Sequence, residues 1–285
     1  MSKAFDPSRF NAAPINPVRT DDKVAFDPAK TLQRIKTAKE EKVSEEVALL
    51  DRPIGQIKAW SFSSLMKFED CPYSIFLKQV EKCPDPSGPA AERGSRIHTS
   101  IEDYIQGLSA ELDPEIKHFH KLIDQLRDLY AEGSVEIEQD WAFNRTWEIT
   151  GWRDKDCWER TKLDAFIHES ETSAWIIDWK TGRKYGNEMK HGQQLQLYAI
   201  AAFLRYPDLE FIKAEMRYLD KNEELSATYT KDQAMRFLKR WTIRGNTMTT
   251  ATTFPAKPSR HNCRWCPHKT TQEGFDKPAC DFFEE

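Results

Sequence analysis

The sequence predicts an α/β core with helical additions at both ends. Two patterns predict it. Short apolar runs that end in turns occupy the middle of the chain, and helical patterns lie before and after them. The composition agrees, because 39% of the 285 residues are hydrophobic and 12% are aromatic, which is enough for a buried core. The mean hydropathy of −0.72 predicts a soluble protein.

The first fifty residues differ from the rest, so we predict an N-terminal arm, flexible or partly helical, over residues 1–50 and a folded domain over residues 51–285. The arm is polar and dotted with prolines, which is typical of a flexible segment, and a helical pattern begins at Thr31. The tetrapeptide Ala-Phe-Asp-Pro occurs at residues 4–7 and again at residues 25–28. Such a repeat could dock a helicase, a polymerase or a single-strand annealing protein. Chance duplication is the alternative.

Within the domain, the patterns predict each element in turn. Helices are predicted over residues 63–80, 90–107, 114–130, 194–204 and 231–244. Strands are predicted over residues 134–144, 146–151, 161–167, 176–180, 211–218 and 227–230. Residues 255–285 form a cysteine-bearing C-terminal tail, which we expect to pack on the helix within residues 61–80.

Acidic and basic side chains meet at the end of one predicted strand. Asp178 and Lys180 share one face of the strand that ends at Thr181 and Gly182, because side chains alternate along a strand. Asp164, in the preceding strand, could bring a second carboxylate beside the first. Two carboxylates and a lysine at a sheet edge make a site for Mg²⁺ or Mn²⁺ and for phosphodiester hydrolysis. An isolated Asp-x-Lys usually marks only a solvated strand end, so the context decides.

Context is present on both sides of this motif. Upstream, His98 and Glu102 lie four residues apart in a predicted helix, and downstream Gln194 and Tyr198 do the same. Each pair shares one helix face. Glu102 could support the His98 helix or a second metal, or be a surface carboxylate. The other six histidines lack such a context, and no role is assigned to them.

This order of motifs resembles the PD-(D/E)XK nuclease superfamily. Within it, the chain looks most like the RecB-like exonuclease branch, which includes the CRISPR-adaptation nucleases and AddB-type helicase-nucleases. The resemblance runs from about residue 61 to residue 280. Asp178 stands where many members carry Glu, a replacement that the family pattern allows. The resemblance implies a restriction-endonuclease-like core, in which a central mixed sheet is flanked by helices, with helical N- and C-terminal additions.

The resemblance also implies the roles of the matched residues. His98, Asp164 and Asp178 would bind the metal, together with a backbone carbonyl near Trp179. An imidazole beside carboxylates suits Mn²⁺ as well as Mg²⁺. The catalytic set would be Asp164, Asp178 and Lys180, with the lysine orienting a water or neutralising phosphate oxygens. The substrate-binding residues would be Gln194 and Tyr198.

The cysteines form a second informative set. Nothing at the N-terminus resembles a signal peptide and no apolar run is long enough to span a membrane, so we expect an intracellular, cytoplasmic protein. Disulfides are disfavoured there, and clustered cysteines suggest a metal. Cys263 and Cys266 form a CxxC on a loop, Cys280 follows in the same tail, and Cys71 lies far upstream.

One distant cysteine and three near the C-terminus resemble the split iron–sulfur signature of this nuclease branch. The resemblance implies a [4Fe–4S] cluster held by Cys71, Cys263, Cys266 and Cys280, which would join the two ends of the fold. The gap between Cys266 and Cys280 is wider than family members usually show. A Zn²⁺ site, with His261 or His268 as a further ligand, is one alternative. Unliganded cysteines are the other.

Charge restricts the partners less than the motifs do. The net charge of −4 argues against a globally basic nucleic-acid binder, but nuclease action needs only a local basic face. Arg183, Lys184 and Lys190 lie between the catalytic strand and the next helix and could contact phosphates.

Three function classes follow. The leading hypothesis is a metal-dependent DNA exonuclease acting in recombination, repair or phage DNA processing. A structure-specific or sequence-specific endonuclease on the same core is the first alternative, because the core does not fix where a strand is cut. A non-catalytic, metal-cluster protein that binds DNA ends is the second. The chain has no GxxxxGK[ST] loop, so any helicase motor would be a separate partner.

Overall fold

The computed structural model describes residues 28–272 and 276–283, and the chain divides into two compact units, residues 1–47 and 48–285. Helix α1, Pro28–Asp51, contains the helix predicted after residue 30. The repeated tetrapeptide lies outside the described residues. No helix of the described chain is long and apolar enough to cross a membrane.

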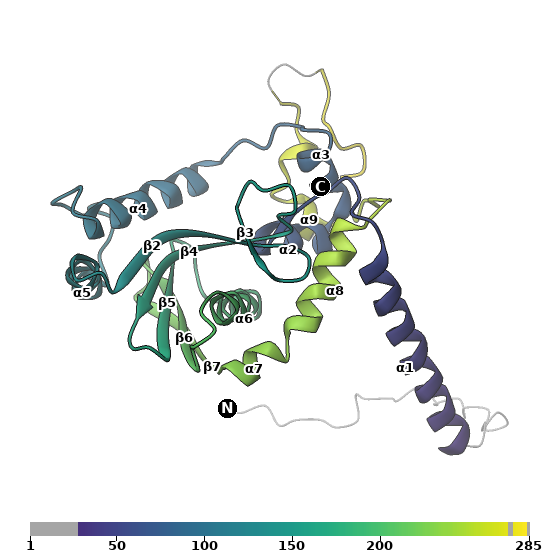
Figure 1. The fold of residues 1–285 in the computed structure, drawn as a ribbon. Helices are drawn as coiled ribbons and strands as arrows, with labels where there is room; N and C mark the ends of the chain where they lie inside the picture. Colours follow the sequence, from purple (N-terminus) through teal and green to yellow (C-terminus); the bar gives the residue numbers. More distant parts are fainter. Residues whose placement is uncertain (1–27, 273–275, 284–285) are drawn as a thin grey trace, which may run out of the picture. The chain divides into compact units, whose positions relative to one another are not determined.

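The second unit is built on one mixed sheet of seven strands, drawn in Figure 1. The strand order is β3-β2-β4-β5-β6-β7, and β1 pairs in parallel with β4. The β5–β6 pair is also parallel, and the remaining pairs are antiparallel. The strands are β1 Trp60–Ser61, β2 Val135–Phe143, β3 Ile149–Thr150, β4 Glu159–His168, β5 Ser173–Lys180, β6 Phe211–Tyr218 and β7 Glu223–Thr230.

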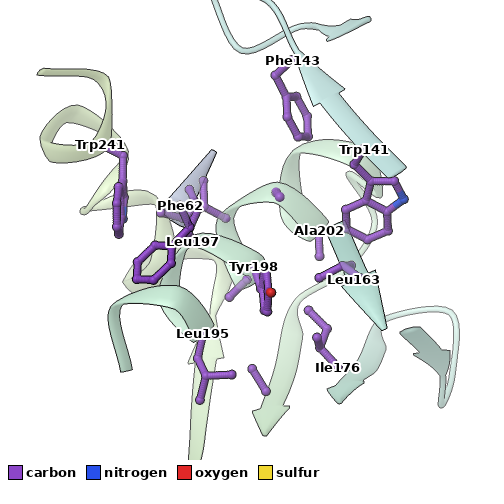
Figure 2. Close-up of a cluster of buried hydrophobic side chains, with 14 of the residues drawn as sticks. Phe62, Trp141, Phe143, Leu163, Ile176, Leu195, Leu197, Tyr198, Ala202 and Trp241 are labelled. Carbon is purple, nitrogen blue, oxygen red and sulfur yellow. The ribbon is translucent and has the colours of Figure 1, made fainter. Parts of the chain in front are cut away.

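Helices cover both faces of this sheet, which confirms the predicted α/β class. The helices are α2 Phe62–Asp70, α3 Pro72–Gln79, α4 Pro89–Ile105, α5 His120–Ala131, α6 Glu188–Arg205, α7 Lys231–Met235, α8 Leu238–Thr249 and α9 Arg260–Cys263. Isoleucines of α4 and α5 pack in one cluster with Ile137, Ala165 and Ile177 of the sheet. The opposite cluster contains α6, from Leu195 to Phe203, with Leu163 and Ile176 of the sheet, as Figure 2 shows.

Several element boundaries differ from the predicted ones. The single helix predicted over residues 63–80 is two helices, because Cys71 is extended with φ of −154° and Pro72 opens the second helix. Proline disfavours the helical conformation of the residue that precedes it. The helix predicted over residues 231–244 is likewise divided into α7 and α8.

Other elements keep their place but change in length. The helix predicted over residues 114–130 begins only at His120, after Phe119 in a left-handed conformation with φ of 68°. The strand predicted over residues 146–151 is limited to Ile149–Thr150. Helix α6 begins six residues before the predicted start, at Glu188.

The C-terminal tail contacts α2 and α3. Lys257 Nζ donates to the carbonyl oxygen of Glu69 at 2.8 Å, and Asn262 Nδ2 donates to that of Asp70 at 2.8 Å. Phe254 stacks on Phe76, with ring centroids 5.0 Å apart. These contacts bring the cysteines of the tail to the helix pair that carries Cys71.

Glu159 is a buried carboxyl at the start of β4 and makes stability depend on pH. Thr161 Oγ1 donates to Glu159 Oε1 at 2.7 Å, and burial raises the pKa of Glu159 to about 8 from its ordinary value of 4.5. Between these values the folded carboxyl keeps a proton that the unfolded one has lost. The free energy of unfolding therefore falls as the pH rises through this window.

We expect Glu159→Gln, which cannot ionise, to remove this loss. Urea unfolding of the natural protein at pH 5 and pH 8 should differ by an extra amount on the order of 4 kcal/mol relative to the variant. Equal pH dependence of both proteins would contradict an ionisation cost at Glu159.

Candidate active site

The two predicted carboxylates lie opposite each other where two strands separate. The antiparallel pairing of β4 with β5 ends at Ala165 and Ile177. Asp164 and Asp178 are the next residues in register, so the sequence places both carboxylates just past the last paired residues. Both side chains are buried, with Asp164 9% and Asp178 3% exposed.

Asp164 is oriented by a backbone donor from the neighbouring strand. The Trp179 N–H donates to Asp164 Oδ2 at 2.6 Å. The other oxygen, Oδ1, lies 3.4 Å from His98 Nδ1. Asp164 therefore connects the catalytic strand to helix α4.

His98 reaches the sheet because α4 packs its apolar face there. Ile97 and Ile101, on either side of His98 in the sequence, are buried in the cluster beneath the helix. Burial lowers the pKa of His98, but the hydrogen bond and the charge of Asp164 outweigh it, and the pKa is raised. The structure thus brings His98 and Asp164 together.

Lys180 lies on β5, the same strand as Asp178, and is the fourth residue of the candidate site beside His98, Asp164 and Asp178. Its Nζ lies 2.6 Å from Asp178 Oδ2. Burial lowers the pKa of Lys180, but the charges of Asp178 and Asp164 outweigh it and raise the pKa. Lys180 is therefore a cation at neutral pH and is suited to neutralise negative charge rather than to accept a proton.

Tyr198 and Gln194 form a chain of hydrogen bonds that ends on Asp178. Gln194 Nε2 donates to the Tyr198 hydroxyl at 2.6 Å, and that hydroxyl donates to Asp178 Oδ1 at 2.7 Å. Tyr198 is only 4% exposed. We therefore propose that it positions Asp178 rather than contacting DNA, which revises the substrate-binding role expected from the sequence.

We expect Tyr198→Phe to weaken divalent-metal binding by about 10-fold, because residues that orient metal ligands have effects of this size. DNA affinity, measured in EDTA, should stay unchanged. A normal metal affinity with weakened DNA binding would instead support the direct contact that the sequence suggested.

Glu138 is a site residue that the sequence reasoning missed. Glu138 of β2 lies opposite Asp164 of β4, because its neighbours pair as Ile137 with Ala165 and Gln139 with Leu163. One of its carboxylate oxygens lies within 4.8 Å of a ring nitrogen of His98 and of a carboxylate oxygen of Asp164, and these three atoms could hold a metal ion. Burial raises the pKa of Glu138, and Lys162 Nζ lies 2.9 Å from its carboxylate.

The backbone at Glu138 explains how its side chain reaches this site. Its φ of 52° is in the left-handed region, which is uncommon for a residue other than glycine. Val135 and Ile137 pack under α4 and α5, whereas Trp141 and Phe143 pack in the cluster beside α6. The alternation of β2 thus reverses at Glu138. Acids alternate along β2 at Glu136, Glu138 and Asp140, and no local signal singles out Glu138.

The comparison with known families decides the identity of the fold. The profile of the PD-(D/E)XK nuclease superfamily matches residues 59–271, a range that includes every residue of the candidate active site. The chain belongs to the PD-(D/E)XK nuclease superfamily. The sequence prediction of this superfamily is confirmed, and the protein is a nuclease.

Two solved structures are similar to this nuclease at low identity. The crystal structure of SSO0001 is 15% identical, has a TM-score of 0.44, and the match covers 82% of this chain and 93% of that one. A phage-related exonuclease from Haemophilus somnus 129PT is 10% identical with a TM-score of 0.28, covering 69% and 95%. No curated protein matches. Since both TM-scores are below 0.5, the assignment rests on the family match.

The nuclease brings its four predicted cluster cysteines to one cavity. A cavity of about 310 Å³ is lined by Cys71, Cys263, Cys266 and Cys280, together with His261 and His268. All six cysteines are free. Cys71 Sγ accepts the backbone N–H of Lys257 at 3.5 Å. His268 is 1% exposed, and neither of its ring nitrogens has a hydrogen-bond partner among the described residues.

Proposed function

We propose that this nuclease is a divalent-metal-dependent DNA exonuclease. The observation that carries the proposal is the group formed by His98, Asp164, Asp178 and Lys180, in which a cation lies 2.6 Å from a carboxylate and an imidazole lies 3.4 Å from the other. Metal ligands combined with a fixed positive charge are suited to the hydrolysis of a phosphodiester.

The donor set fits Mg²⁺ or Mn²⁺. Carboxylate oxygens are the ligands that both ions prefer, and an imidazole nitrogen adds affinity for Mn²⁺. His98, Asp164 and Asp178 would hold the ion, and Glu138 is a further ligand that we add here. When bound, the cation supplies Lewis-acid chemistry at the scissile phosphate.

Other residues of the protein position the metal ligands and neutralise the charge of the phosphate. The Trp179 N–H and the Tyr198 hydroxyl hold the two aspartates in place by hydrogen bonds of 2.6 and 2.7 Å. Lys180 presents its ammonium group to the phosphate oxygens, and this positive charge counters the charge that develops on them during attack by water.

We expect Glu138→Gln to weaken metal binding by about 10-fold or more. Loss of the Lys162 ion pair is the competing explanation, so Lys162→Ala is the control. That variant removes the ion pair but keeps the carboxylate, and its metal affinity should not fall. Equal weakening in both variants, measured by calorimetry, would show that the ion pair and not the ligand matters.

We also propose a [4Fe–4S] cluster in the cysteine cavity. Four thiols surround one space, and a backbone N–H donates to Cys71 Sγ, as is usual around cluster sulfurs. A single Zn²⁺ would need thiolates about 4 Å apart, given Zn–S bonds of about 2.3 Å. In the described chain no three cysteine sulfurs lie within 4.8 Å of one another, which favours the larger cluster over zinc.

End-labelled DNA tests the nuclease proposal and separates its alternatives. Anaerobically purified protein is incubated with single- and double-stranded DNA in Mg²⁺, Mn²⁺ or EDTA. Metal-dependent release of short products from the ends would support the exonuclease and reveal its polarity. Internal cuts would support a structure-specific endonuclease. DNA binding with no cleavage in either metal would favour a non-catalytic end-binding protein. A role in recombination, repair or phage DNA processing, partner docking by the arm and a cytoplasmic location stay predictions.

A further inference from the structure

Large apolar side chains are exposed where helix α6 begins, outside the group of residues that the proposed chemistry uses. Tyr185 is 81% exposed, Met189 82% and Trp265 82%. Six of the nine tryptophans are buried in the core, so Trp265 is an exception. Contiguous exposed apolar groups usually mark an interaction surface.

These side chains belong to two segments that meet in space. Tyr185 lies in the loop after Lys180, and Met189 lies in the first turn of α6. Trp265 lies between two cysteines of the tail. Lys190, the neighbour of Met189, lines the same cavity as Trp265. The start of α6 therefore borders the loop of the tail that carries Trp265.

Basic groups are interleaved with these aromatic ones. The Arg264 guanidinium lies 5.0 Å from the centre of the Trp265 ring. Lys190 and Arg183 are exposed on the α6 side. The carboxylate of Glu188, in the same turn of α6, accepts the N–H of Gly186 at 2.8 Å, and Asp70 is the one acidic residue that lines the cavity among the described residues.

One face of α6 connects this surface to the candidate active site. Lys190, Gln194 and Tyr198 are spaced four residues apart and so share a helix face. Their backbone positions span about 12 Å at the helical rise of about 1.5 Å per residue. Tyr198 then donates to Asp178. About three or four stacked nucleotides, at about 3.4 Å each, would cover the distance between the start of α6 and the metal ligands.

We propose that Tyr185, Met189, Lys190, Arg264 and Trp265, here called the aromatic–basic patch, bind an unpaired DNA strand and guide it to Asp178. Exposed aromatic rings stack on unpaired bases of any sequence, and nearby cations pair with the backbone phosphates. In a duplex the bases are already stacked on each other and cannot stack on these rings. This inference deepens the proposed function, on which it rests, by naming single-stranded DNA as the substrate class.

Equilibrium binding in EDTA tests the patch without any cleavage. Fluorescence anisotropy is recorded with a labelled oligonucleotide, alone or hybridised to its complement, for the natural protein and for Tyr185→Ala and Trp265→Ala. Each variant should bind the single strand about 10-fold more weakly, within the range known for base stacking, and the duplex unchanged. Leu108→Ala removes another exposed apolar side chain, which is 73% exposed and lies outside the patch, and should bind as the natural protein does.

Three results would overturn the proposal. They are unchanged single-strand binding in both variants, equal weakening for single strand and duplex, and no single-strand binding by the natural protein. Tyr185 lies outside the cysteine tail, so its variant remains informative if Trp265→Ala disturbs that tail. Binding is measured in EDTA, which prevents cleavage, so it does not depend on nuclease activity. If the patch binds the single strand but the protein cleaves no DNA in the separate assay with Mg²⁺ or Mn²⁺, the proposed function is disproved and the inference about the patch stands.

Discussion

Lys180→Ala is expected to lower the rate of DNA cleavage by about 100- to 1,000-fold, since removal of one preorganised charge-stabilising group has effects of this order. The Lys180 ammonium group lies 2.6 Å from Asp178 and is a cation at neutral pH, because the neighbouring aspartates raise its pKa. DNA affinity in EDTA should change little, because one phosphate contact is a small part of binding. Single-turnover cleavage at saturating Mn²⁺ measures the effect.

A matched lysine on the neighbouring strand provides the control. Lys213 of β6 pairs with the buried Glu215, with 2.8 Å between Nζ and Oε1, and takes no part in the candidate site. Lys213→Ala should cleave DNA at the natural rate. If Lys180→Ala cleaved DNA as fast as Lys213→Ala and the natural protein, Lys180 would have no role in catalysis.

Gly245→Ala is expected to destabilise the fold by about 3 kcal/mol, at the upper end of the usual cost of overpacking. A Cβ at this position would lie 2.4 Å from Trp60 Nε1 and 2.7 Å from Trp158 Cζ2. Trp60 cannot move away, because it stacks on Trp241 at 6.2 Å and meets Trp158 edge-on at 5.4 Å. Urea unfolding at neutral pH measures the change.

Another helical glycine isolates this packing effect from helix propensity. A Cβ on Gly192 of α6 would meet nothing within 4 Å. Gly192→Ala should therefore stabilise the protein by about 0.5–1 kcal/mol, the ordinary gain in a helix interior. If Gly245→Ala shifted stability in the same direction as Gly192→Ala, the close packing of the two indoles would be disproved.

The sequence predicted the parts of the fold that depend on local pattern. Alternation along β5 placed Asp178 and Lys180 together, and the spacing of Gln194 and Tyr198 placed both on one face of α6, where the structure has them. What the hydroxyl of Tyr198 contacts depends on how α6 packs on the sheet, which helical spacing does not reveal. The buried hydrogen bond from Tyr198 to Asp178 is therefore seen only in the structure.

Glu138 was missed for a different physical reason. Its place beside Asp164 depends on the register of β2 against β4 and on one left-handed residue inside a strand. Strand register is a long-range property, and a positive φ at glutamate has no local sequence signal. The break of the 63–80 helix at Cys71, by contrast, has a local sequence signal, because Pro72 follows it.

Binding of Mn²⁺ tests the central claim most directly, because every proposed step depends on the group around Asp164. The electron paramagnetic resonance signal of free Mn²⁺ is followed during titration of the natural protein and of Asp164→Asn, with circular dichroism to check folding. We predict saturable binding by the natural protein and at least a 10-fold loss of affinity in the variant. Equal Mn²⁺ affinity of two folded proteins would contradict the assignment of this group as the metal site.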